Sequence, residues 1–253
     1  MIITFLGTGT SQGVPVIACG CEVCTSPHHH DRRLRTSVLV EVDGKVIAID
    51  SGPDFRYQML RAGVKHLDAV VFTHEHKDHI AGLDDVRAFN YFQQEAMDVY
   101  ASLRVQDALK REFFYIFADY KYPGIPQLNM HTIGDEPFLV GPVQFTPIQV
   151  LHYRLPVLGF RIKDFTYITD AKTISPAEVE KIKGSKILVI NALQKEPHVS
   201  HFTFNEAIAL AQQIGAEKTY LTHISHRLGK HADVSLELPE GVELAYDGLR
   251  LEL

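Results

Sequence analysis

The stretch Thr73-His74-Glu75-His76-Lys77-Asp78-His79 decides the fold prediction, because it places four potential metal ligands within six residues. It follows Ala69-Val70-Val71-Phe72, an apolar run that predicts a buried strand. Unpaired imidazole and carboxylate groups are costly to bury, and neighbouring imidazoles repel once protonated. A metal removes both costs, since it binds neutral imidazole and ionised carboxylate. The stretch therefore predicts a metal site at the end of a strand; a solvated loop between a strand and a helix is the alternative.

Composition limits the class of protein. The chain has 253 residues, of which 45% are hydrophobic and 22% charged, and this balance predicts a globular domain. The formal net charge of -6, with no basic run, disfavours sequence-independent binding to nucleic acid. The first residues lack the basic and apolar regions of a signal peptide, and no apolar run approaches the ~20 residues of a membrane span. We therefore expect a soluble cytoplasmic protein with a single domain, residues 1–253.

Hydrophobic periodicity and turn residues predict the secondary structure. Strands are expected at residues 2–6, 36–42, 45–50, 69–72, 97–101, 142–150, 157–162, 165–169, 186–190 and 218–222, with two short strands around Asp247-Gly248. Helices are expected at residues 54–63, 84–92, 103–118, 175–184 and 203–214. Asp43-Gly44 predicts a tight hairpin, and Ser175 and Thr203 predict capped helix starts. Strands come first and then alternate with helices, twice over, which predicts two sheets packed face to face with helices outside.

Three more candidate ligands, His152, Asp170 and His223, each follow closely after a predicted strand. Strand ends are where a rigid scaffold can direct a catalytic loop. Each residue alone is weak evidence, because a lone histidine is commonly a core or surface residue. Together with the first four ligands they make seven, which is enough for two metals.

The H-x-H-x-D-H spacing of residues 74–79 resembles the signature of the metallo-β-lactamase-fold hydrolases. The resemblance implies an α/β fold, namely an αβ/βα four-layer sandwich with two mixed sheets face to face and helices outside. It assigns His74, His76 and His152 to one divalent metal, and Asp78, His79 and His223 to a second, with Asp170 bridging the two. Asp50 resembles the family's acid that orients the metal-binding loop; a helix N-cap is the alternative. The oxygen-reducing branch has glutamate at the position of His76, so the motif favours hydrolysis.

The three cysteines, Cys19, Cys21 and Cys24, form a C-x-C-x-x-C pattern typical of a zinc site and unlike a disulfide framework. Together with His223-Ile224-Ser225-His226 they resemble the PhnP-like phosphodiesterase branch of the superfamily. That resemblance implies one structural Zn²⁺ held by Cys19, Cys21, Cys24 and His226; reduced, inert thiols are the alternative. It also implies that His201 binds the substrate phosphate and protonates the leaving oxygen, with His198 as a nearby competitor.

The resemblance implies a dinuclear metal-dependent phosphodiesterase that hydrolyses a small cyclic or nucleotide-like diester through a hydroxide shared by two Mn²⁺ or Zn²⁺ ions. Asp78, Asp170 and His201 are the expected catalytic residues. The expected partner is then a small phosphodiester. A homodimer is also expected, because members of the family often form dimers. Alternatives are a ribonuclease Z-like nuclease, a thioester hydrolase and a non-catalytic zinc-stabilised binding module. Core packing is expected for the aromatic residues near 115–122, with the rim of a substrate pocket as the alternative, and a solvated surface is expected for His28-His29-His30.

Overall fold

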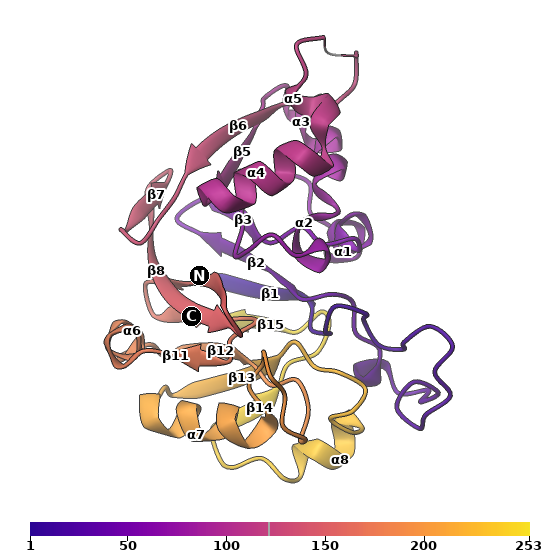
Figure 1. The fold of residues 1–253 in the computed structure, drawn as a ribbon, viewed down its shortest axis with the longest axis vertical. Helices are drawn as coiled ribbons and strands as arrows, with labels where there is room; N and C mark the ends of the chain where they lie inside the picture. The colour runs from indigo at the N-terminus through magenta and orange to yellow at the C-terminus, as the bar shows by residue number, and fades with distance from the viewer. Residues whose placement is uncertain (121) are drawn as a thin grey trace.

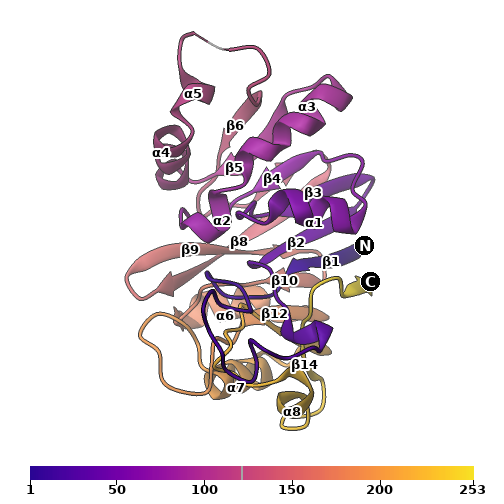
Figure 2. The same cartoon turned by 90° about the vertical axis from the view of Figure 1, so that its right-hand side faces the viewer.

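The computed structural model describes residues 1–120 and 122–253, and its core is two mixed sheets that pack face to face (Figures 1 and 2). The first sheet has the strand order β15 (Arg250–Glu252), β1 (Ile2–Gly7), β2 (Ser37–Val42), β3 (Lys45–Ile49), β4 (Ala69–Val71), β5 (Met97–Ala101) and β6 (Leu128–Thr132). The strands from β1 to β3 are antiparallel, whereas those from β3 to β6 are parallel.

The second sheet repeats this design. Its order is β11 (Thr173–Ile174), β8 (Val143–His152), β9 (Leu155–Ile162), β10 (Phe165–Tyr167), β12 (Ile187–Asn191), β13 (Lys218–Thr222) and β14 (Val242–Leu244), and β7 (Phe138–Val140) pairs with β8. Strands β8 to β10 are antiparallel, and β10 to β14 are parallel. Parallel strands of one sheet end at the same edge. In each sheet, the loops that follow the parallel strands therefore lie together at that edge.

Helices cover the outer face of each sheet, which completes four layers (Figure 2). The first sheet carries α1 (Phe55–Ala62), α2 (Lys77–Ile80), α3 (Arg87–Gln93), α4 (Leu103–Glu112) and α5 (Phe114–Phe117), with the 3₁₀ helix η2 (Leu83–Val86). The second carries α6 (Pro176–Ile182), α7 (Phe204–Ile214) and α8 (His231–Ser235). A further 3₁₀ helix, η1, spans His29–Asp31. None of the described helices is long and apolar enough to cross a membrane.

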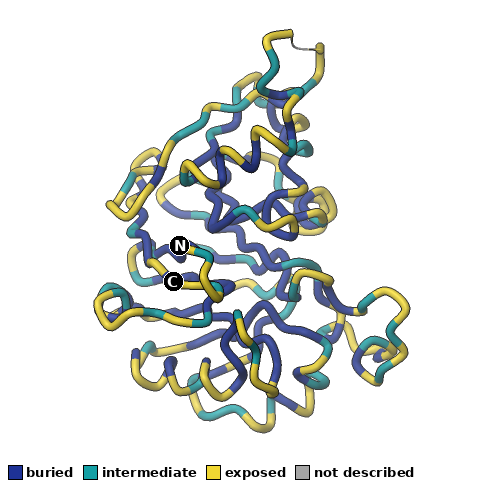
Figure 3. The backbone as a smooth tube through the Cα atoms, viewed as in Figure 1, coloured by how far each residue is buried: buried dark blue, intermediate teal, exposed yellow. Residues whose placement is uncertain are grey.

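The innermost core lies between the two sheets, and alternate residues along the strands belong to it, such as Val38, Val40 and Val42 (Figure 3). Phe5 of β1 contacts the opposing sheet through Tyr220, with ring centres 5.9 Å apart. Phe145 and Phe160 pack edge to face from neighbouring strands of the second sheet. The predicted four-layer α/β sandwich is therefore confirmed.

Local turn chemistry agrees with the predictions. Asp43 and Gly44 both have positive φ values, +49° and +75°, as a two-residue hairpin turn requires. The Thr203 hydroxyl accepts a hydrogen bond from the Glu206 amide, and the Thr203 amide donates one to the Glu206 carboxylate, which forms the predicted capping box. Ser175 caps α6, and Pro176 occupies its first position.

Several predicted boundaries are wrong. The helix expected at 103–118 breaks at Phe113, whose φ and ψ of -117° and 43° leave the helical region. Tyr120 and Tyr122 are 81% and 71% exposed, so they do not pack in the core as expected. Strands β6, β7 and β11 were not predicted, because they are edge or near-edge strands whose half-exposed residues show little hydrophobic alternation. The strand expected at 165–169 ends at Tyr167, which leaves Asp170 in a loop.

Candidate metal centres

The predicted metal ligands converge at the ends of strands from both sheets. His74 to His79 follow β4, His152 ends β8, Asp170 follows β10 and His223 follows β13. His74, His79, Asp170 and His223 are almost fully buried, and Asp78 is 9% exposed. Such a concentration of titratable groups in a protein interior requires compensation by partners or by metal ions.

Asp50 holds the metal-binding stretch in place from the end of β3. Its carboxylate accepts hydrogen bonds from the Thr73 amide at 2.8 Å and from the Thr73 hydroxyl at 2.8 Å. It also lies 2.7 Å from Nδ1 of His79, so Nε2 of that ring is left to face the centre. Burial raises the pKa of Asp50. The predicted orienting role is confirmed and the N-cap alternative is wrong, because α1 begins after Asp54.

His79 lies between two carboxylates. Its Nε2 is 3.2 Å from Oδ2 of Asp78 and 3.2 Å from Oδ2 of Asp170. Burial acts to lower the pKa of His79, but the carboxylates of Asp78, Asp170 and Asp50 outweigh it and raise that pKa well above its ordinary value. Burial acts in the opposite sense on Asp78 and Asp170, yet His79 and His223 hold the pKa of both carboxyl groups below the ordinary range. Both carboxylates are thus ionised, as metal ligation requires.

His74 provides a direct test of whether a cation fits. Its Nδ1 lies 3.0 Å from the Thr73 hydroxyl, whereas Nε2 is buried and has no hydrogen-bond partner. Burial holds the pKa of His74 well below its ordinary value, so the ring is neutral. A neutral imidazole with a buried, unpartnered nitrogen is the donor that a divalent transition metal binds.

Two further histidines come from the second sheet. Nδ1 of His152 lies 2.8 Å from the carbonyl oxygen of Ser200, to which it can donate, and this contact leaves Nε2 available. His223 lies 3.3 Å from Oδ2 of Asp170 through Nδ1 and 3.4 Å from the Thr10 hydroxyl through Nε2. Burial lowers the pKa of His152, and it lowers the pKa of His223 to about 4. Both rings are therefore neutral at physiological pH.

The donor atoms form three overlapping sets, within each of which the ligand atoms lie inside 4.8 Å of one another. The sets are His74, His79 and Asp170; Asp78, His79 and His223; and His152, Asp170 and His201. Because Asp170 belongs to two sets and His79 to two, the sets make one cluster. This donor set suits two divalent cations.

Two residues are placed differently from the assignment that the sequence suggests. His76 belongs to none of the compact sets; its ring centre lies 4.7 Å from that of His74 and 5.1 Å from that of His152. His201 was expected to contact substrate only, yet its Nε2 is 3.1 Å from Oδ1 of Asp170. Its nitrogen therefore lies among the donor atoms of the cluster.

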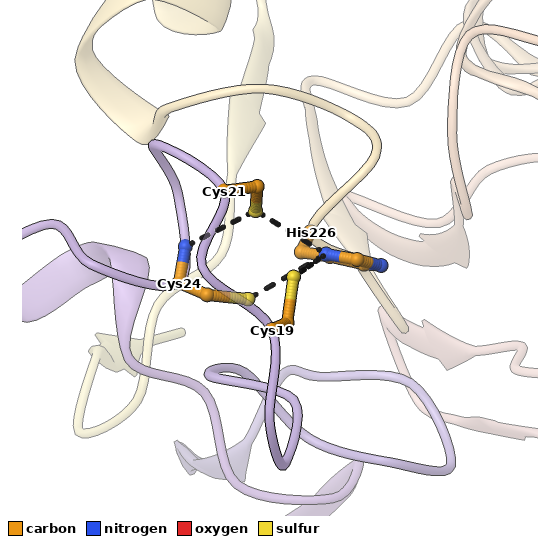
Figure 4. Close-up of side chains that lie close together, drawn as sticks. All are labelled: Cys19, Cys21, Cys24 and His226. Atoms are coloured by element: carbon orange, nitrogen blue, oxygen red, sulfur yellow. Dashed lines mark hydrogen bonds between the residues drawn. The ribbon is translucent and has the colours of Figure 1, made fainter.

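The cysteine cluster lies apart from this centre, where the N-terminal loop meets the segment after β13 (Figure 4). Nδ1 of His226 lies 3.3, 3.4 and 3.5 Å from Sγ of Cys19, Cys21 and Cys24. Tetrahedral zinc with its usual bond lengths would separate a sulfur from a nitrogen by about 3.5 Å. The four side chains thus fit one Zn²⁺.

Charge at the cysteines differs from thiol to thiol. A hydrogen bond from the Cys24 amide, followed by the contact with His226, lowers the pKa of Cys21 to about 6. Burial raises the pKa of the Cys24 thiol to about 11. Cys21 is therefore the thiolate that is present before zinc binds, whereas Cys24 gives up its proton to zinc.

Comparison with known proteins agrees with this arrangement. Residues 45–224 match the family model of the β-lactamase superfamily domain. The chain belongs to the metallo-β-lactamase superfamily. A solved structure described as a new diphosphatase from the PhnP family is 42% identical to this superfamily member, with a TM-score of 0.94, and the match covers 100% of this chain and 96% of that chain. The predicted superfamily and its PhnP-like branch are thus confirmed.

Two other relatives extend the comparison. The octanoyltransferase of Porphyromonas gingivalis is 42% identical over 247 residues, which are 96% of this chain but 50% of that protein. The chain therefore spans about half the length of this curated relative. Zn²⁺-bound PqqB from Methylobacterium extorquens shares the metallo-β-lactamase fold, with a TM-score of 0.83 at 21% identity and 100% coverage of both chains.

Backbone strain marks the candidate metal centre. Asp50, Asp170 and His223 have φ values of +65°, +55° and +55°, in a region that residues other than glycine seldom adopt. Such strained residues persist only where the surrounding structure holds them, and they concentrate at functional sites. Here each one turns a side chain from a strand end into the cluster.

Sequence reasoning missed the supporting hydroxyl groups. Thr73 contacts both Asp50 and His74, Thr169 donates to Asp170 at 2.6 Å, and Thr10 approaches His223. Thr73 and Thr169 each directly precede a predicted ligand, which is the only sequence feature that could have indicated them. Thr10 lies 213 residues from His223, so nothing local connects the two.

Proposed function

We propose that this chain is a dinuclear metal-dependent hydrolase that cleaves a P–O bond in a small, cyclic or nucleotide-like phosphate diester, or in a related diphosphate. One observation carries the proposal. Asp170 lies within 3.3 Å of His79, His201 and His223, so a single buried carboxylate joins the two halves of a cluster that suits two cations. The likeness to a PhnP-family diphosphatase over the whole chain supports a phosphorus substrate.

The residues of the chain divide the work. When bound, two cations would polarise a phosphoryl oxygen and make water more acidic. The residues that would hold them are His74, His76, Asp78, His79, His152, Asp170 and His223. Asp170 would offset the repulsion between two bound cations, because it is the anion common to two of the compact ligand sets. Asp50 keeps His79 in one orientation through its 2.7 Å contact with Nδ1.

His201 is the proposed acid. Its Nε2 faces the cluster beside Asp170, and the residue is 8% exposed. Histidine can donate a proton near neutral pH, which the leaving oxygen of an ester requires. We assign His201 to the leaving oxygen and to contact with the phosphoryl group.

Zinc at the cysteines would have a structural role. The Ile224 amide donates to the Thr8 carbonyl, and the Thr10 amide donates to the Ile224 carbonyl, so the N-terminal loop runs along the segment that carries His223. Zinc bound by His226 and the three cysteines would hold these two segments together. It would thereby support His223 without contacting substrate.

Ribonuclease activity is the weaker candidate. Between Asp170 and His201 the chain contains β11, α6, β12 and short connections, which leave no room for an inserted RNA-binding arm there. The net charge of -6 also opposes binding to a polyanion.

The test is a substrate screen with protein loaded separately with Mn²⁺ and Zn²⁺. It includes bis(p-nitrophenyl) phosphate, 2′,3′-cyclic nucleotides, nucleoside diphosphate esters, precursor tRNA and a glutathione thioester. Turnover of a small diester or diphosphate, with little on tRNA or thioester, is expected. If the fully metal-loaded protein hydrolyses none of them, the result would support a non-catalytic binding module. If it prefers the thioester, the proposed substrate class would change from a phosphate ester to a thioester.

A further inference from the structure

The loop between β12 and α7 brings three polar groups against the proposed acid. Nδ1 of His198 lies 3.2 Å from Nδ1 of His201, and the Ser200 hydroxyl lies 3.3 Å from the former and 3.2 Å from the latter. The other nitrogen of His201, Nε2, lies 3.1 Å from Asp170. Both nitrogens of one ring are therefore engaged from opposite sides.

We propose that His198 is a positioning residue, which together with Ser200 holds Nδ1 of His201 so that Nε2 faces the leaving group. This inference rests on the proposed function, because it assigns a support to the proposed acid of that reaction. His198 itself lies partly exposed at the edge of the site and does not belong to any of the compact ligand sets in the described chain.

The hydrogen-bond directions support this assignment. The Ser200 backbone amide can only donate, and it points to Nδ1 of His198 at 3.4 Å, so this nitrogen is an acceptor. Nδ1 of His201 then donates to the acceptor on His198. A ring flip of His201 would place carbon atoms where Nδ1 and Nε2 now make these contacts, and His198 therefore opposes the flip.

The same loop holds a second histidine. The Ser200 carbonyl oxygen engages Nδ1 of His152 at 2.8 Å, and the rings of His152 and His201 stand edge to face with centres 4.4 Å apart. His201 also stacks on His223 at 4.9 Å. Packing against these rings limits translation of the His201 ring, whereas the contact with His198 opposes its rotation.

The affected step is cleavage of the P–O bond. Oxygen of water bonds to phosphorus, the bond to the leaving oxygen breaks with its electron pair on that oxygen, and this oxygen takes one proton from Nε2 of His201. The proton released by water restores the histidine. Leaving groups that are strongly basic need the donated proton, whereas p-nitrophenolate departs without it. Loss of position at His201 should therefore affect the two kinds of substrate unequally.

The experiment compares His198→Ala with His198→Asn in the metal-loaded protein. Turnover is measured on bis(p-nitrophenyl) phosphate and on an alkyl diester or diphosphate that the parent protein hydrolyses. For His198→Ala we expect kcat to fall by about 10- to 100-fold on the alkyl substrate. On the p-nitrophenyl substrate we expect a change of less than about 3-fold, and KM should change little. Asn places a side-chain amide near the position of Nδ1, so His198→Asn should recover most of the lost rate.

Controls separate this role from a structural one. His66→Ala removes a half-exposed histidine that pairs with Asp68 away from the site, and it should leave both rates unchanged. Metal content and thermal midpoint are measured for every variant. If His198→Ala loses metal or unfolds, Ser200→Ala, which removes one hydroxyl from the same contact, must show the selective loss.

Equal loss on both substrates, no loss on either, or no recovery with Asn would overturn the inference. The proposed function would still stand in each of these cases, provided that the parent protein hydrolyses the p-nitrophenyl and alkyl substrates. A parent protein without activity on any phosphorus substrate would instead overturn the proposed function.

Discussion

At the scale of single residues, Asp170 is the most informative side chain. It lies 31 residues from His201 and 53 from His223 along the chain, yet it contacts both and also His79. Its φ of +55° aims the carboxylate into the cluster, while Thr169 donates to it at 2.6 Å. One carboxylate thus contacts histidines from three separate segments of the chain.

The clean variant at this position is Asp170→Asn, because Asn tolerates positive φ whereas Ala there costs about 1 kcal/mol or more. Removing the charge should lower kcat/KM by at least about 100-fold and reduce the bound metal, since the anion between the cations is lost. Steady-state kinetics and metal analysis of the purified variant check this.

Asp164→Asn is the matched control, since Asp164 lies on the turn before β10 and pairs with exposed Lys186. It should leave activity unchanged. If Asp170→Asn retains activity within a few-fold of the parent protein, Asp170 does not have the bridging role.

At the scale of elements, the N-terminal loop depends on contacts with the other end of the chain. Buried Arg33 donates to the Ala245 carbonyl at 2.6 Å and to the Thr8 hydroxyl at 2.8 Å. Figure 1 shows this indigo loop beside the yellow C-terminal part. The cysteines at its tip make the same kind of contact with His226, so the loop is fastened at two points.

Cys21→Ser should remove one zinc per chain, because serine lacks the thiolate that zinc prefers. A loss of about 2 kcal/mol would lower Tm by roughly 4–8 °C in a chain of this size. Any loss of activity should be secondary, because the zinc site affects catalysis only by holding the segment that carries His223. Glu22→Gln, in the same loop, is the control. Unchanged zinc content in Cys21→Ser would contradict the structural site.

Zinc binding at the cysteines should also depend on pH. The pKa of Cys21 lies at about 6, below its ordinary value, so the thiolate ligand is present above that pH and is lost as the pH falls through it. Protons compete with zinc for both Cys24 and Cys21, so release into a chromogenic chelator should rise as the pH falls, and further once the Cys21 thiolate is lost near pH 6. Release that increases toward alkaline pH would contradict this expectation.

At the scale of the whole molecule, the two sheets hold the site between them. Each sheet supplies ligands from its strand ends, and the shared core of Phe5, Phe145, Phe160 and Tyr167 keeps the two sets in register. Metal ions that bind both halves should stabilise the folded state, since they bind the native chain better than the unfolded one.

Chelation should therefore abolish turnover and lower Tm, and added Mn²⁺ or Zn²⁺ should restore both. At free metal 100 times the dissociation constant, the stabilisation would be about 2.7 kcal/mol. Calorimetry and kinetics on dialysed protein check the two effects together. Full activity in protein shown to contain no metal would contradict a metal-dependent hydrolase.

Local sequence was sufficient for features that depend on near neighbours. The Asp43-Gly44 turn, the Thr203 capping box and the strand before His74 follow from residues within a few positions of one another. Edge strands such as β7 and β11 were missed because a two- or three-residue strand has too little periodicity to recognise. Phe113, where the predicted helix breaks, is buried in the cluster that covers the first sheet, a tertiary contact that local sequence does not indicate.

The ligand types and their spacing predicted a metal site, because few other roles explain clustered histidine and aspartate after a buried strand. The resemblance of that spacing to the metallo-β-lactamase signature implied a hydrolase. Only the tertiary structure showed that His201 contacts Asp170, that His198 lies 3.2 Å from His201 and that His76 lies outside the compact sets. Those relations join loops from different strands. Their distances are determined by how the two sheets pack, which no short segment of sequence specifies.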